Sequence, residues 1–157
     1  MKLDKKIDID ILDFLKYGKF DYIKLGQTKD WILNNFPDPD DQSKSILKYG
    51  DIEFHFDENI LFLIFSEDFN NFELNGGKKI NVINWIFNEL SELTLINVLK
   101  LLNEKDINYK KDENKWFIKI RLESGVELTF DNDEIENLNK NNYIMKTIGL
   151  IDDENKK

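Results

Sequence analysis

The sequence predicts an α+β fold in which two helix-plus-antiparallel-strand repeats form one sheet, with the helices packed on one face. Three observations predict it. Thr28 and Thr94 stand where helix N-caps are expected. Apolar residues alternate with a period of two after each predicted helix, and similar strand segments, 50–57 and 125–131, occur in both halves of the chain.

The chain length and these repeats define the expected domain organisation. The 157 residues fit one domain, expected over residues 1–151. The repeats are expected at about 22–69 and 88–131, and the charged residues 152–157 are expected to form a solvated tail.

The first half begins with two predicted helices. Apolar residues at helical spacing between 7 and 17 predict a helix that ends at Gly18. Thr28 begins a second helix, which Pro37 ends. The following loop is rich in aspartate.

The hydrophobic period then changes to that of strands. Residues 45–49 and 52–57 alternate on either side of a predicted turn at Gly50-Asp51. Residues 60–65 are apolar on both faces, which predicts a central strand. A polar loop at 70–79 contains Gly76-Gly77, for which we expect a flexible turn.

The second half repeats this order. After the Thr94 cap, four apolar residues follow at positions i, i+3, i+4 and i+7: Leu95, Val98, Leu99 and Leu102. Strands are expected at 107–110, 116–123 and 126–130, and a closing strand at 143–151.

The two repeats share a strand pattern that defines one face of the expected sheet. With one residue inserted, both copies read Gly, apolar, Glu, apolar, polar, aromatic, Asp. Chance similarity between two amphipathic hairpins is the alternative explanation. Five residues alternate with the core-facing ones and are expected on the open face: Glu53, His55, Asp57, Glu127 and Thr129.

Composition restricts the function classes. The chain has no Cys, which excludes disulfides and cysteine nucleophiles. A net charge of −9 and a pI of about 4.7 disfavour nucleic-acid binding and favour a basic partner, although acidic surfaces also serve solubility alone. The N-terminus lacks a hydrophobic signal region and no apolar run is long enough to span a membrane, so we expect a cytoplasmic protein.

The sequence shows no catalytic motif, metal site or cofactor motif. His55 is the only histidine, and no serine stands in a G-x-S-x-G elbow. The carboxylate pairs lie on strands and loops expected to be solvated, and residues 131–136 depart from a calcium loop at its glycine position. We expect Trp85 and Trp116 in the core and Trp31 at the surface, where Trp31 is a candidate partner contact.

One segment resembles a known group of proteins. A Leu-Gly-Gln-Thr turn at 25–28 precedes a short helix that ends near Pro37-Asp38, and residues 49–54 read Tyr-Gly-Asp-Ile-Glu-Phe. This pattern resembles small bacterial proteins encoded beside polymorphic toxins and presumed to be their immunity proteins. The unit is also similar to the helix-plus-hairpin repeats of the beta-lactamase-inhibitor-protein and BamE-like folds. The resemblance implies tight protein–protein binding and supplies no catalytic residues.

These observations give three hypotheses of function. The first is an immunity-type protein that binds and neutralises a cognate bacterial toxin domain, with a basic nuclease as one candidate. The second is a regulatory or scaffold module that binds another protein and has no enzymatic activity. The third is a carboxylate-based hydrolase, which requires a pocket around a perturbed carboxylate. For the first two, the expected contact residues are Glu53, His55, Asp57, Glu127, Thr129 and Trp31.

Overall fold

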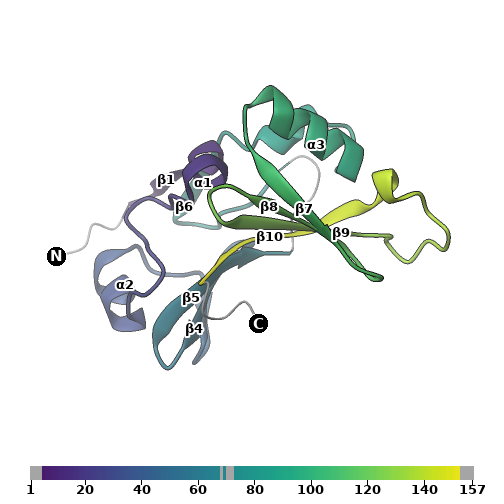
Figure 1. The fold of residues 1–157 in the computed structure, drawn as a ribbon. Coiled ribbons are helices and arrows are strands. Elements are labelled where there is room, and N and C mark those ends of the chain that lie inside the picture. The colour runs from purple at the N-terminus through teal and green to yellow at the C-terminus, as the bar shows by residue number, and fades with distance from the viewer. Residues whose placement is uncertain (1–4, 68, 70–72, 153–157) are drawn as a thin grey trace.

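The computed structural model describes residues 5–67, 69 and 73–152 and has an α+β fold, as the sequence predicts (Figure 1). Its main element is an eight-stranded antiparallel sheet. In spatial order the strands are β2 (Asp41–Gln42), β3 (Ile46–Tyr49), β4 (Ile52–Asp57), β5 (Ile60–Ser66), β10 (Ile144–Ile151), β9 (Val126–Asp131), β8 (Ile118–Leu122) and β7 (Tyr109–Glu113).

The helices cover one face of this sheet. They are α1 (Ile11–Tyr17), α2 (Lys29–Asn35) and α3 (Leu95–Glu104), with short 3-10 turns η1 (Ile86–Glu89) and η2 (Lys140–Asn142). In Figure 1, α1 and α3 lie on the same side of the twisted sheet, and α2 lies near its β4 end. No helix in the described part of the chain is both long and apolar enough to cross a membrane.

The N-terminal residues differ from the prediction. Residues 7–10 do not begin a helix but form β1 (Ile7–Asp10), which pairs in parallel with β6 (Ile80–Ile83). The β-branched Ile7 and Ile9 alternate with aspartates, and β6 provides the hydrogen-bond partners of a strand. The helix begins only after Asp10, whose carboxylate accepts a hydrogen bond from the Asp13 N–H at 3.1 Å.

The two predicted threonine caps are confirmed, and each is tied to a strand in the same way. Thr28 and Thr94 accept hydrogen bonds from the N–H groups three residues later, at 3.0 and 3.3 Å. Each also forms an isolated antiparallel bridge, Thr28 with Ile60 and Thr94 with Ile144. Ile60 begins β5 and Ile144 begins β10. Each helix is therefore joined to a strand in the middle of the sheet, and in the second half this strand, β10, lies beyond the predicted repeat 88–131.

The core-facing residues of the strands and helices form one hydrophobic cluster. Phe36, at the end of α2, packs edge-on against Tyr49 with ring centroids 5.4 Å apart. The Tyr49 hydroxyl donates a hydrogen bond of 2.7 Å to the carbonyl of Pro37. Burial raises the pKa of the Tyr49 phenol well above its usual value, and the nearby carboxylate of Asp38 adds a smaller increase.

The expected flexible turn at Gly76-Gly77 is instead held against the β3–β4 turn. The Asp40 carboxylate accepts hydrogen bonds from the N–H groups of Gly50 at 2.7 Å and Lys78 at 3.1 Å. The backbones approach so closely that a Cβ atom on Gly50 would lie 2.4 Å from the Gly77 nitrogen. The glycines therefore permit close packing between two distant turns.

Candidate interaction surface

One row of residues crosses all strands of the large sheet on the face that the helices leave open. Directly paired residues of antiparallel strands project from the same face, so the register identifies the row. From β2 to β7 the paired residues are Asp41, Lys48, Glu53, Phe65, Gly149, Glu127, Arg121 and Lys110. Charged residues occupy both ends of the row and uncharged residues occupy its centre.

The apolar side chains at the centre of the row pack over Gly149 of β10, which has no side chain. A Cβ atom on Gly149 would lie 3.3 Å from the Phe65 ring and 3.4 Å from a methyl group of Leu63. Both side chains therefore rest against the backbone of β10. Leu63 also pairs with Ile151, which extends the apolar area along the strand.

His55 lies beside this apolar centre and is held from two directions. Its Nε2 is 2.8 Å from Oε1 of Glu53, and the two side chains are 23% and 15% exposed. Its ring lies edge-on to Phe65, with centroids 5.9 Å apart, and Phe62 lies at 6.4 Å. Because carboxylates only accept hydrogen bonds, the imidazole N–H donates to Glu53 and the ring is fixed in orientation.

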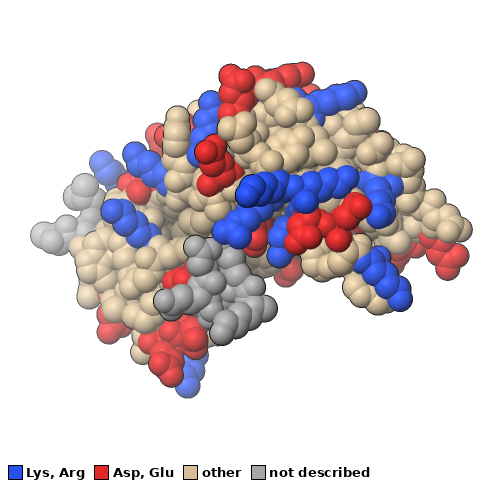
Figure 2. Space-filling model, in the orientation of Figure 1, with Lys and Arg blue, Asp and Glu red and all other residues tan. Residues whose placement is uncertain are grey.

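The β7–β10 half of the open face carries hydroxyl and charged groups instead. The hydroxyl groups of Thr129 and Thr147 are hydrogen-bonded to each other across β9 and β10. Lys119 Nζ lies 3.9 Å from the carboxylate of Glu127, and Arg121 pairs with Glu127 in the register. Figure 2 shows Lys and Arg side chains gathered across the middle of the molecule, where β7 to β10 lie in Figure 1.

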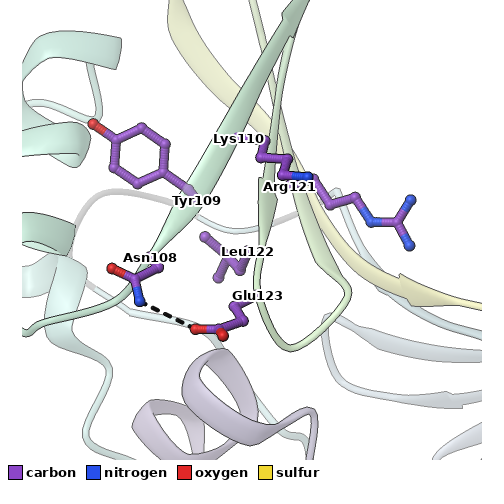
Figure 3. Close-up of a pocket in the computed structure, with 6 residues that line it drawn as sticks. All are labelled: Asn108, Tyr109, Lys110, Arg121, Leu122 and Glu123. Atoms are coloured by element: carbon purple, nitrogen blue, oxygen red, sulfur yellow. Dashed lines mark hydrogen bonds between the residues drawn. The ribbon is translucent and has the colours of Figure 1, made fainter.

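A hollow of about 510 Å³ lies at the outer strands of this half (Figure 3). Figure 3 shows Lys110 and Arg121 extending to one side of β7 and β8, whereas Tyr109 extends to the other side. At the lower end of the view, Asn108 donates a hydrogen bond of 3.1 Å to Glu123. The paired Lys110 and Arg121 make this outer edge basic, in contrast to Asp41 at the opposite end of the row.

The register places the five predicted sheet residues on the same face. Glu53, His55 and Asp57 are on β4, and Glu127 and Thr129 are on β9; all five alternate with buried neighbours. They do not form one cluster, because β5 and β10 lie between β4 and β9. The apolar side chains on these two central strands were not among the predicted contacts, since residues 60–65 gave no alternation that could identify an outward face.

The three tryptophans are placed differently from one another. Trp85 is buried, as predicted. Trp31 is 39% exposed but lies on α2, whose Phe36 packs on the core side of the sheet, so it is not part of the open face. The prediction of a buried Trp116 is wrong: this residue precedes β8, lies in the β7–β8 turn and is 71% exposed.

Acidic side chains among the described residues make structural contacts and form no metal-binding cluster. No group of three His, Asp or Glu side chains within residues 5–67, 69 and 73–152 is arranged to hold a metal ion. The carboxylates at the acidic end of the sheet instead make structural contacts. Asp40 binds backbone N–H groups, and Asp51 accepts a hydrogen bond from the Asn75 N–H at 3.0 Å.

Comparisons with known proteins do not add to this description. No protein-family model, curated protein or solved structure matches the chain.

Proposed function

We propose that this protein is a binding protein that neutralises a partner protein by covering it with the open face of its sheet, in the manner of an immunity protein. The observation that carries the proposal is the row with an apolar centre and charged ends. Specific protein interfaces have this organisation, in which a desolvated apolar core is surrounded by polar groups. Phe65 and Leu63 form the proposed core, and Glu53 and Glu127 lie on either side of it.

The partner that fits best is a basic protein, such as a toxin domain in the same cytoplasm. The chain carries a net charge of −9, which attracts a basic protein during diffusional encounter. Such steering acts mainly on the association rate and is screened by salt. We therefore expect the association rate constant to fall as ionic strength rises, while the dissociation rate changes little.

Fixed side chains favour binding by this face. His55 is held by Glu53 and by two phenylalanine rings, and Leu63 and Phe65 rest on the backbone at Gly149. Side chains that are already ordered lose less conformational entropy when a partner binds. This preorganisation suits a protein that must bind tightly without catalysing a reaction.

The test is co-expression with the toxin domain encoded beside the gene of this protein. We expect the wild-type protein to rescue growth, and the Phe65→Asp variant and a Glu53→Lys, Glu127→Lys double variant to lose rescue. Ile96→Asp is the matched control, because Ile96 is 37% exposed on α3, away from the sheet face. Circular dichroism must show that each variant is folded.

The outcomes separate the hypotheses. Loss of rescue in both face variants, with rescue retained by Ile96→Asp, would support the proposed surface. Rescue that survives both face variants would place the contact elsewhere on the molecule. A folded wild-type protein that does not rescue would contradict the toxin assignment and favour the regulatory or scaffold module.

A further inference from the structure

The β7–β8 hairpin ends in a turn that is held by one side chain. The Asn114 side-chain oxygen accepts hydrogen bonds from the N–H groups of Trp116, at 2.7 Å, and Phe117, at 3.0 Å. The Asn114 N–H also donates to the Phe117 carbonyl at 3.1 Å. Figure 1 shows this hairpin ending away from the helices. The turn is therefore fixed before any partner binds.

This fixed turn presents two aromatic side chains to solvent. Trp116 is 71% exposed and Phe117 is 36% exposed. Turn positions usually hold small or polar residues, so two consecutive aromatic residues are not needed to form the turn. Exposed aromatic groups on a rigid backbone have the features of interface anchors, because they bury a large area on binding and lose little conformational entropy.

Lysines accompany both aromatic rings. Lys115 Nζ lies 4.8 Å from the centroid of the Trp116 ring, and Lys119 Nζ lies 5.9 Å from that of Phe117. Residues 114–119 contain these two lysines and no carboxylate. The whole hairpin, residues 109–123, has five cationic and three acidic side chains, a net charge of +2 in a chain of net charge −9.

We propose that this hairpin tip is a second binding surface, which holds an acidic protein segment that carries apolar side chains. Trp116 and Phe117 contact the apolar side chains, and Lys115 and Lys119 contact the carboxylates. The tip is positively charged, whereas the chain as a whole is negatively charged. The tip therefore attracts an acidic segment, whereas the overall charge attracts a basic protein. The inference does not depend on the toxin-binding proposal.

A local acidic segment fits the tip better than an extended anionic surface does. A membrane or a nucleic acid presents negative charge over a wide area. Ile118 pairs with Phe130, so the acidic stretch 131–136 begins beside the tip. An extended anionic surface would also approach this stretch and would be repelled by the net charge of the chain. A short protein segment can contact the tip alone.

The test is an NMR titration that follows the indole N–H signals of the three tryptophans, assigned by substitution. The probe is a synthetic peptide in which Leu residues are interspersed among Glu residues, and the control peptide has Lys in place of every Glu. We expect the Trp116 signal to shift with the acidic peptide and not with the basic one. The shift should decrease as salt is added, because the lysine contacts are exposed.

Variants of the intact protein test the assigned roles. Trp116→Ala should raise the dissociation constant of the acidic peptide by about tenfold or more. A Lys115→Gln, Lys119→Gln double variant retains both rings and should weaken binding at low salt only. Trp31→Ala is the matched control, because Trp31 is also partly exposed but lies on α2 beside Asp30, and it should bind as the wild type does.

Three results would overturn the proposal. The first is an unchanged Trp116 signal at saturating peptide concentration, and the second is an equal effect of Trp31→Ala and Trp116→Ala. The third is a Trp116 response to vesicles containing anionic lipid, or to a single-stranded oligonucleotide, in the absence of any response to the acidic peptide. That result would assign the tip to a lipid surface or a nucleic acid instead of a protein segment.

Discussion

The two halves of the large sheet, β2–β5 with α2 and β7–β10 with α3, have corresponding backbone hydrogen bonds. Lys29 N donates to the Asn59 carbonyl and Leu95 N donates to the Tyr143 carbonyl, both at 2.8 Å. Leu61 N and Met145 N donate back to Gln27 and Leu93, both at 2.9 Å. The start of each helix is thus bonded to the start of one strand, β5 in the first half and β10 in the second. These two strands are neighbours in the sheet.

Their open faces, in contrast, carry different chemistry. Both halves keep a cation opposite a glutamate, Lys48 with Glu53 and Arg121 with Glu127. Beside that pair, however, Ile46 and His55 in the first half correspond to Lys119 and Thr129 in the second. The first half therefore provides the aromatic and apolar part of the open face and the second half provides its hydroxyl groups and much of its positive charge.

The difference shows which constraint acts on which face. The inward residues of both halves must fill one close-packed core, so their apolar alternation is the same. The outward residues contact solvent or a partner and can change without loss of the fold. Function is therefore expected to depend on the positions where the halves differ, including the Trp116 tip, which only the second half carries.

The largest expected difference between the halves lies at the glycines before β4 and β9. Gly50 and Gly125 have φ angles of 59° and 97°, where a side chain is strained. A Cβ on Gly50 would lie 2.4 Å from two backbone atoms, whereas a Cβ on Gly125 would meet only a Leu150 methyl group at 3.5 Å. Gly50→Ala should lower the free energy of unfolding by about 3 kcal/mol or more, and Gly125→Ala by about 1 to 2 kcal/mol.

Urea denaturation followed by circular dichroism measures both values. Equal losses at the two glycines would mean that the contact between the Gly50 turn and the Gly76-Gly77 loop does not contribute to stability. A loss at Gly50 that exceeds the loss at Gly125 would support the close packing that separates the first half from the second.

A smaller effect is expected at Tyr49, whose counterpart in the second half is Leu122. Both side chains are buried, but only Tyr49 has a hydroxyl, and it bonds to the buried Pro37 carbonyl. Tyr49→Phe removes that donor from the carbonyl and should cost about 1 to 2 kcal/mol of folding free energy at neutral pH. Denaturation midpoints at unchanged m value measure this loss.

The same substitution should change the alkaline stability profile. Burial raises the pKa of Tyr49 in the folded protein, whereas a tyrosine in the unfolded chain titrates at about pH 10. Above that pH the unfolded chain binds fewer protons than the folded chain, so stability falls as pH rises. Below it, both states keep the proton and this group adds no pH dependence. Tyr49→Phe should therefore show a shallower alkaline fall, and an unchanged slope would contradict the assignment.

Local signals in the sequence predicted most of the fold, and non-local pairing accounts for the main differences. Thr28, Thr94 and Gly18 act within one turn of chain, and the structure confirms all three as caps. The pairing of β1 with β6 joins residues far apart in sequence, so periodicity alone assigned residues 7–10 to a helix. Trp116 was assigned to a strand because the hydrophobic pattern continues through the turn that Asn114 holds.

The open face was predicted only in part, for a related reason. Alternation identified the outward residues of β4 and β9, which each have one polar face. The strands between them, β5 and β10, are apolar on both faces, so their outward residues carry no signal in the sequence. The contribution of Phe65 and Leu63 follows from the register across Gly149, which only the folded structure provides.

The smallest expected effects test the feature that the halves share most closely, the threonine caps. Thr28→Ala and Thr94→Ala should each lower the free energy of unfolding by about 1 kcal/mol, because each removes an acceptor from the first turn of a helix. The loss should be greater at Thr94, which is 5% exposed and begins the helix with four buried residues, than at Thr28, whose helix buries only Ile32. Serine at either position keeps the hydroxyl and should restore most of the stability in a denaturation experiment. If only Thr94→Ala lowers the free energy of unfolding, the Thr28 hydrogen bond does not stabilise α2, although its geometry matches that of Thr94. Packing around Ile32 and Phe36 would then hold α2 in place.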